Sequence, residues 1–335
     1  MKSKLEFQSL ISVVVPFLNE EDNVDLMYSA LSEELLSSTY EIIFIDDGSS
    51  DNTWGRIMGC IHFDKKVKGI KLSRCFGHQN ALKAGIDIAK GDCVITIDGD
   101  LQQPPHVINN LIQKWKEGYK IVNAERVSNS NQGIIKGILS QFFYLIYKYL
   151  NKSQTLNWNV SDFRLMDRQV VNILKEISGQ NLFIRGTIQW MGFRQSYVKY
   201  QLQKRAFGQS KFTLKKMLEL ASIGLTSGGI TPLRLSLFMG FIFAFFAFIY
   251  CLYALYATIF LKSVMPGWAS VIASILLLSG VQLIVLGIIG EYIGKLFIQS
   301  KKHPSYIIDE ISKDSSELVK DKYLVNPYNN KNKNE

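Results

Sequence analysis

The amino-acid sequence predicts an α/β protein whose first part forms a doubly wound, mostly parallel sheet and whose C-terminal part forms a two-helix transmembrane hairpin. Two observations predict the sheet. Apolar, β-branched runs alternate with helical patterns over the first hundred residues, and these runs are nearly continuously apolar, as in strands buried on both faces. A third observation predicts the hairpin, because two long segments near the C-terminus carry no charge.

The predicted elements follow one another in the order expected of a parallel sheet. The first strand, Ile11–Val15, is ended by Pro16, and the helix after it, Asn19–Leu36, has acidic residues in its first turn. The later segments predict three more strands and a helix before the last of them: Glu41–Ile45, Val67–Leu72, Gln79–Ala89 and Cys93–Ile97. Because ligands of such sheets bind at the carboxyl ends of the strands, we expect the chemistry there.

Composition excludes several classes of protein. The chain has 335 residues, enough for one large domain or two smaller ones. Its four cysteines have no CxxC spacing and its four histidines are scattered, which argues against a disulfide framework or a structural zinc site. With 47% hydrophobic and 20% charged residues, it is neither a disordered protein nor a multi-span transporter.

The net charge of +9 is unevenly distributed. Residues 1–100 carry 10 basic and 16 acidic side chains, whereas residues 101–234 carry 19 basic and 6 acidic ones. A basic middle segment could serve nucleic acid, a membrane surface or a phosphorylated substrate. Nucleic acid is the poorest of these interpretations, because the lysines alternate with aromatic stretches typical of membrane surfaces.

The two uncharged segments predict a membrane hairpin. Leu235–Leu261 has 27 uncharged residues and Ser263–Gly290 has 28, separated only by Lys262. A hydrocarbon core of about 30 Å needs about 20 apolar residues, so each segment can span it. The alternative, two buried helices of a soluble core, is disfavoured by this length. Basic residues flank both outer ends, which predicts both termini in the cytoplasm: Arg234, Lys295, Lys301 and Lys302.

Two further segments, Ile134–Leu150 and Phe212–Leu225, combine apolar faces with lysines and aromatics and are predicted to be interfacial amphipathic helices. Helices packed on the domain's own core are the alternative. The N-terminus lacks the apolar stretch of a signal peptide. We therefore expect five parts: a cytoplasmic catalytic domain, a juxtamembrane loop with its helix, two spans, and a cytoplasmic tail, at residues 1–205, 206–234, 235–261, 269–290 and 291–335.

Acidic residues follow two of the predicted strands. Asp98-Gly99-Asp100 places two carboxylates two residues apart, with Gln102 close by, which suits one divalent cation such as Mg²⁺ or Mn²⁺. An exposed turn is the alternative, since a bare DxD is common. The cluster Asp46–Asp51 lies where a ribose or base could be hydrogen-bonded, although it is also a common turn composition.

Taken in order and spacing, a set of motifs resembles the family-2 glycosyltransferases, and within them the polyprenyl-phosphate glycosyltransferase group. The resemblance covers roughly residues 10–308 and rests on the segments Val14–Glu21 (VVPFLNEE), Asp46–Thr53 (DDGSSDNT), Phe76–Ala81 (FGHQNA), Asp98–Pro105 (DGDLQQPP), Asp162–Met166 (DFRLM), Arg205–Phe212 (RAFGQSKF), Pro232–Arg234, Gly287–Gly294 (GIIGEYIG) and His303–Tyr306 (HPSY).

This resemblance implies a GT-A fold that transfers a sugar with inversion from a nucleotide sugar, UDP-glucose being the best choice, to undecaprenyl phosphate for cell-surface polysaccharide or O-antigen modification. It implies a bacterial plasma-membrane enzyme with a downstream flippase and a second glycosyltransferase as partners, and a possible homo-oligomer. The implied nucleoside-binding residues are Pro16, Phe17, Glu20 and Asp47. The implied metal and diphosphate ligands are Asp98, Asp100 and Gln102, and the implied phosphate-binding residues are Arg126, Ser140, Arg205 and Lys211.

The resemblance also implies that Asp162 is a catalytic carboxylate, but the chemistry suggests a different role for it. A phosphate nucleophile with a second pKa near 6 is already ionised at neutral pH and needs no strong base. We therefore expect Asp162 to be an orienting group, or the partner of a basic residue, rather than an obligatory base. The sequence has a single arginine, Arg126, where many relatives have two, and Lys136 is the expected substitute.

Two alternatives remain open. A processive polysaccharide synthase would need a QxxRW motif, and Gln189-Trp190 does not match it. A catalytically inactive scaffold that binds lipid or partner proteins would not need Asp98, Asp100, Arg205 and Lys211, all of which are present.

Overall fold

The computed structural model describes residues 9–127, 160–177, 183–203, 267–301 and 303–312, together with scattered positions between 240 and 256. The chain forms two compact units, which are treated separately. The first comprises residues 1–133, 156–211 and 302–335, and the second comprises residues 134–155 and 212–301. The predicted interfacial helices and most of the first predicted span lie outside the described residues.

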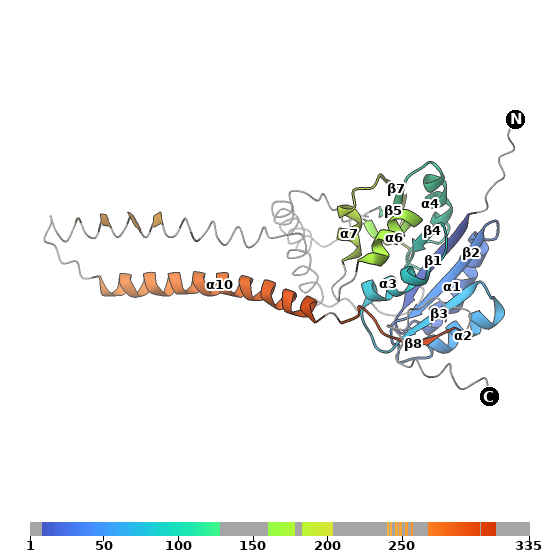
Figure 1. Cartoon of the computed structure of the whole chain (residues 1–335), viewed down its shortest axis with the longest axis horizontal. Helices are drawn as coiled ribbons and strands as arrows, with labels where there is room; N and C mark the ends of the chain where they lie inside the picture. The colour runs from blue at the N-terminus through green and yellow to red at the C-terminus, as the bar shows by residue number, and fades with distance from the viewer. Residues whose placement is uncertain are drawn as a thin grey trace. The chain divides into compact units, whose positions relative to one another are not determined.

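The first unit, drawn in Figure 1, is built on an eight-stranded sheet. Its strands follow the order β7-β5-β6-β4-β1-β2-β3-β8. Its strands are β1 (Leu10–Phe17), β2 (Thr39–Asp46), β3 (Val67–Leu72), β4 (Cys93–Thr96), β5 (Ile121–Arg126), β6 (Val160–Asp167), β7 (Gln195–Tyr200) and β8 (Ile308–Ile311). The pairs β1–β2, β1–β4, β2–β3 and β5–β7 are parallel, and β4–β6, β5–β6 and β3–β8 are antiparallel. The predicted α/β fold with a mostly parallel sheet is confirmed.

Helices cover both faces of this sheet. The described helices of the unit are α1 (Glu21–Glu34), α2 (Thr53–Phe63), α3 (His78–Ile88), α4 (Val107–Lys116), α6 (Arg168–Glu176) and α7 (Ile184–Trp190). Apolar residues of α1, α2 and α4 share one buried cluster with the sheet, and those of α3, α6 and α7 share the other. Alternate residues of a strand serve the two faces, so Val13 and Val15 join the first cluster and Val14 the second.

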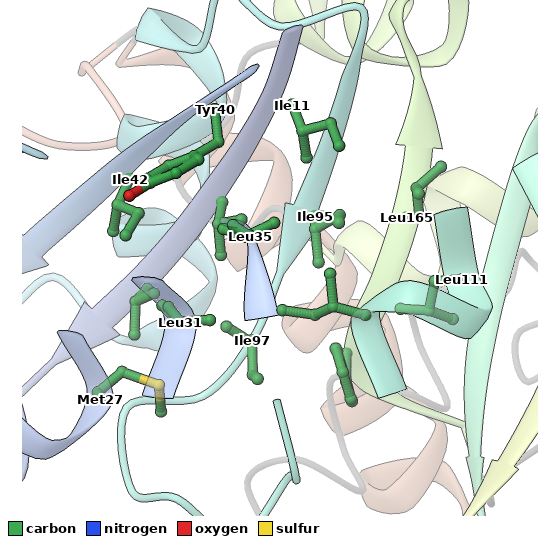
Figure 2. Packing of buried hydrophobic residues seen from close by; sticks show 14 of the residues in the cluster. Ile11, Met27, Leu31, Leu35, Tyr40, Ile42, Ile95, Ile97, Leu111 and Leu165 are labelled. Atoms are coloured by element: carbon green, nitrogen blue, oxygen red, sulfur yellow. The ribbon is translucent and has the colours of Figure 1, made fainter. Parts of the chain in front are cut away.

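The first cluster shows why the central strands are so apolar. Ile11 and Ile42 are buried between the sheet and α1, whose Met27 and Leu31 point into the same layer (Figure 2). The Phe17 and Phe44 rings meet edge to face, 5.2 Å apart, at the carboxyl ends of β1 and β2. This packing holds rigid the strand ends that bear the polar loops.

The second unit contains α10 (Trp268–Ser300), a helix of 33 residues. Within it, Leu278–Ile298 is long and apolar enough to cross a membrane, with a mean hydropathy of 1.8. It is the one such helix among the residues that the structure describes. Seven residues lie between the end of α10 and β8, a strand of the first unit's sheet that the sequence analysis did not predict.

Candidate active site

The loops after β1 and β2 are bound together by hydrogen bonds. The Asn19 backbone N–H donates to Ser49 Oγ at 2.9 Å, and the Ser50 N–H donates to Asn19 Oδ1 at 2.7 Å. The Glu20 N–H donates to Thr53 Oγ1 at 3.0 Å. Asn19 has a φ of +52°, which asparagine tolerates better than most residues. The two predicted nucleoside-binding segments therefore form one surface at the carboxyl ends of neighbouring strands.

The predicted nucleoside-binding residues differ in how they are placed. Pro16 and Phe17 lie within β1, and the Phe17 ring is buried in the core. Glu20 accepts a hydrogen bond from Asn23 Nδ2 at 2.6 Å. Both carboxylate oxygens of Asp47 are engaged by residues 75–77: Oδ1 accepts from the Phe76 N–H at 2.7 Å, and Oδ2 accepts from the Gly77 N–H at 3.0 Å and from the Cys75 thiol at 3.3 Å. Asp47 thus shapes the loop before α3.

The DGDLQQ segment forms a tight loop after β4. Leu101 has a φ of +58°, and Asn19 is the only other non-glycine residue with a positive φ in the described part of the chain. Such a conformation is costly and tends to occur where function requires it. The Gln102 N–H donates to Asp100 Oδ1 at 3.1 Å, which holds the two predicted ligands against each other.

Gln103 holds both the backbone and the side chain of Asp98 by hydrogen bonds. The Asp98 N–H donates to Gln103 Oε1 at 2.9 Å, and Gln103 Nε2 donates in turn to Asp98 Oδ2. The other carboxylate oxygen, Oδ1, is buried and accepts no hydrogen bond from the described residues; its nearest cation is His78 Nε2, 3.3 Å away. Asp98 Oδ1 is therefore a buried carboxylate oxygen that is suited to binding a divalent cation.

The chemistry of the loop fits the metal that was expected. Among the described residues no group of three or more His, Cys, Asp or Glu side chains is arranged as a metal cage. Magnesium and manganese are commonly held by one or two carboxylates together with substrate phosphates, and Asp98 and Asp100 supply that number. Asp98, Asp100 and Gln102 are accordingly the residues that would hold such an ion.

Asp162 is the centre of a buried cluster of donors. It lies on β6, next to β4 in the sheet, and its side chain is 5% exposed. Arg185 of α7 donates two parallel hydrogen bonds to this carboxylate, from Nε to Oδ1 and from Nη2 to Oδ2, both at 2.9 Å. Gln79 Nε2 donates to Oδ2 at 2.9 Å, while Arg164 Nη2 and His78 Nε2 each lie 3.5 Å from a carboxylate oxygen.

These contacts set the protonation states of the cluster. Burial alone would raise the pKa of Asp162, but the charge of Arg185 and the bonds from His78 and Arg185 hold it well below the usual value. Burial alone would lower the pKa of His78, yet Asp98 and Asp162 raise it to about 9. The pKa of Asp98 is raised, first by burial and then by Asp162 and Asp100. At neutral pH the imidazolium therefore lies between two carboxyl groups.

This arrangement favours an orienting role for Asp162. A carboxylate that accepts hydrogen bonds from a bidentate arginine and a glutamine, with its pKa depressed, is a weak proton acceptor. It is better suited to fixing cations beside the reaction centre. Burial and the neighbouring Arg185 lower the pKa of Arg164 to about 10, which still leaves that guanidinium charged at neutral pH.

The predicted phosphate-binding residues are described only in part. Arg126 lies at the end of β5, where its side chain is exposed. Lys136, Ser140, Arg205 and Lys211 lie outside the described residues. The sequence analysis predicted no individual role for five residues of this cluster: His78, Gln79, Gln103, Arg164 and Arg185. Four of them lie within motifs of the family resemblance. Arg185 does not, and a single arginine in a short helix has no recognisable sequence pattern.

A mostly parallel α/β sheet whose strands end in carboxylates and cations is typical of enzymes that bind a nucleotide at that edge. This chain belongs to glycosyltransferase family 2. Residues 12–174 match the family described as glycosyl transferase family 2, and residues 231–296 match the GtrB C-terminal hairpin. The predicted family and the predicted glycosyltransferase activity are thereby confirmed, and the hairpin match agrees with membrane anchoring.

Relatives resemble the chain over almost all of its length. The prophage bactoprenol glucosyl transferase homolog of Escherichia coli is 40% identical, covering 90% of this chain and 99% of the relative. The bactoprenol glucosyl transferase of Shigella phage SfV is 40% identical, covering 89% and 97%. Among solved structures, Mycobacterium tuberculosis glucosyl-3-phosphoglycerate synthase in complex with Mn²⁺ and uridine-diphosphate-glucose is 19% identical, with a TM-score of 0.46 over 64% of this chain and 76% of that one.

Proposed function

We propose that this enzyme transfers glucose from UDP-glucose to bactoprenyl (undecaprenyl) phosphate and so supplies a lipid-linked sugar for cell-envelope polysaccharide. The observation that carries the proposal is the 40% identity to bactoprenol glucosyl transferases, which extends through the catalytic domain and the hairpin alike. We further propose that the enzyme lies in the bacterial plasma membrane with two spans, and that its catalytic domain and both termini are cytoplasmic.

The proposed reaction needs no general base. An oxygen of the acceptor phosphate forms a bond to the anomeric carbon as the bond from that carbon to the diphosphate oxygen breaks, and UDP leaves. The nucleophile is already ionised at neutral pH, so no proton has to be removed. The remaining difficulty is electrostatic, because an anionic nucleophile must approach an anionic donor.

We assign the residues to roles on this basis. Pro16, Phe17, Glu20 and Asp47 contact or shape the nucleoside site. Asp98, Asp100 and Gln102 would hold Mg²⁺ or Mn²⁺, which when bound would neutralise the diphosphate leaving group. We assign contacts to the substrate phosphates to four basic residues and one serine, namely Arg126, Lys136, Arg205, Lys211 and Ser140, because charge-assisted bonds to phosphate are strong. Asp162 positions its cationic neighbours.

A donor panel tests the substrate assignment. The full-length enzyme in detergent would be incubated with undecaprenyl phosphate, Mg²⁺ or Mn²⁺, and labelled UDP-glucose, UDP-galactose or UDP-N-acetylglucosamine. We expect label in the organic phase with UDP-glucose, inversion at the anomeric carbon, and no transfer by Asp100→Ala. Transfer only from another donor would change the sugar assigned to the enzyme. No transfer from any donor would contradict the proposal as a whole.

A further inference from the structure

Arg185 presents its guanidinium in an unusual way. Two of its nitrogens are fixed on Asp162, whose carboxylate is almost completely buried, yet about one third of the arginine side chain is exposed. The third nitrogen, Nη1, has no hydrogen-bond acceptor in the described part of the chain. The group is therefore a cation fixed in orientation, and the described residues leave some of its donors, which face away from Asp162, without an acceptor.

Asp162 does not neutralise the cations around it. Arg164, Arg185 and His78 all lie within 3.5 Å of this one carboxylate. Asp98, 3.3 Å from His78, offsets the imidazolium, so Asp162 and the two arginines carry a net charge of +1. Arg164 is 3% exposed and cannot reach a ligand in solvent, which leaves Arg185 as the member of the pair that is open to a substrate. Gln79 supports the arrangement because its Nε2 donates to Asp162 while its Oε1 accepts from the Ile184 N–H at 3.2 Å.

The order of the strands places this cation relative to the two substrates. The proposed nucleoside-binding loops follow β1 and β2, and the proposed metal and diphosphate loop follows the adjacent strand β4. Asp162 lies on β6, one strand further from the nucleoside side. A donor that runs from β2 towards β4 presents its sugar near β6, and the acceptor phosphate has to attack beyond the diphosphate.

We propose that Arg185 binds the phosphate of the acceptor lipid and that Asp162 is the residue that positions it. This inference rests on the proposed function, since it assumes a phosphate monoester as the acceptor. A planar guanidinium already fixed in orientation loses little further freedom when it binds an oxyanion. It would hold the nucleophile beside the diphosphate while offsetting the repulsion between the two anions.

Steady-state kinetics of full-length Arg185→Gln and Arg185→Lys test the assignment. KM would be measured separately for undecaprenyl phosphate and for the donor, with Arg194→Gln as the matched control. Arg194 is an exposed arginine that stacks on Tyr119, 4.5 Å from the ring centre, and belongs to neither the proposed site nor its loops. For Arg185→Gln we expect a rise of about 10- to 100-fold in the KM for the acceptor, the range for hydrogen bonds to charged groups. The KM for the donor should stay within about twofold.

Each other result contradicts the assignment in a recognisable way. A raised donor KM with an unchanged acceptor KM would assign Arg185 to the diphosphate or the sugar, and a loss of kcat with both KM values unchanged would limit it to supporting Asp162. If Arg185→Gln fails to fold, Arg185→Lys keeps the charge, and an acceptor KM equal to that of Arg194→Gln would overturn the proposal. Failure of the wild-type enzyme to use undecaprenyl phosphate would instead contradict the proposed function.

Discussion

At the scale of single residues, Asp162 separates two mechanisms that the motif alone leaves open. A general base needs a pKa near the working pH and a free lone pair facing the nucleophile. Asp162 has neither property, because Arg185 and Gln79 occupy its oxygens and its pKa is held low. Its burial would be costly without these partners, which explains why cations gather around it.

The first prediction concerns Asp162→Asn. The amide keeps one acceptor oxygen and the shape of the side chain, but leaves Arg164 and Arg185 with surplus positive charge. We expect kcat to fall by no more than about a hundredfold, at the low end of the 10²–10⁴ range of general bases. The acidic limb of the pH–rate profile should remain as in the wild type, and the pKa of His78 should fall because Asp162 raises it. Loss of the acidic limb would instead identify Asp162 as the base.

At the scale of elements, the loops depend on backbone positions that few residues can adopt. Gly48 has a φ of +70°, and a Cβ there would lie 2.4 Å from the Arg74 carbonyl carbon and 2.7 Å from the Cys75 nitrogen. The loop after β2 therefore packs directly on the backbone of the loop that Asp47 organises. A substitution at Gly48 must displace both loops.

The second prediction compares Gly48→Ala with Gly192→Ala. Gly192 also has a φ of +70°, but no atom lies within 4 Å of the position of its Cβ. The conformational cost of about 1–2 kcal/mol is common to both variants. We expect Gly48→Ala to lower the Tm further than Gly192→Ala and to raise the KM for the donor. Equal effects in the two variants would show that the neighbouring loop moves to accommodate the added Cβ at little cost in stability.

Glu41 joins the central strands by a buried polar network. It lies on β2, and its carboxylate accepts from Ser12 Oγ on β1 at 2.5 Å and from the Lys90 N–H at 2.7 Å, and it pairs with Lys68 Nζ of β3 at 2.5 Å. Burial alone would raise the pKa of Glu41, but the bonds from Lys68, Ser12 and Lys90 outweigh burial and lower it. Its charged form is thus stabilised by folding.

The third prediction follows from the sign of that pKa change. A carboxyl whose pKa is lowered on folding stabilises the native state above its unfolded pKa of about 4.3, and the contribution is lost as the pH falls through the folded value. Glu41→Gln should therefore lower the free energy of unfolding by about 3 kcal/mol at pH 7, since it leaves Lys68 without its partner. Chemical denaturation of both proteins should show this difference shrinking below pH 5. A difference independent of pH would exclude the ionised pair as its source.

At the scale of the whole molecule, the parts that could be predicted are those that obey simple periodicity. β1 to β4 were expected because their runs are rich in apolar and β-branched residues, although β3 also carries Lys68 and Lys71. β6 was not, because Asp162 and Arg164 interrupt its apolar pattern on the face that bears the site. The partnership of Asp162 with Arg185 joins residues on different elements across a segment with no motif, and no local pattern indicates it.

The C-terminal end of the chain shows the same limit. β8 is a four-residue strand with two acidic side chains, too short and too polar to be recognised in a sequence. In the structure it pairs antiparallel with β3, and Ile308 is fully buried. Glu310 accepts from Trp54 Nε1 and pairs with Lys71 Nζ, both at 3.0 Å. The segment after the hairpin therefore completes the sheet and covers the edge of β3.

The last prediction is that β8, which follows the membrane hairpin in the sequence, stabilises the catalytic domain. Tyr306, just before β8, donates from its hydroxyl to Asp87 Oδ2 on α3 at 2.9 Å, so the segment is held by both the sheet and a helix. Ile308→Ala removes a buried side chain and should cost about 2–4 kcal/mol. Asp309→Asn on the same strand changes an exposed residue and should stay within about 0.5 kcal/mol. Chemical denaturation of the two full-length variants, followed by tryptophan fluorescence, would measure the difference. Equal stability would mean that β8 is not bound to the sheet in solution, whereas a loss confined to Ile308→Ala would show that β8 is bound to the sheet through Ile308.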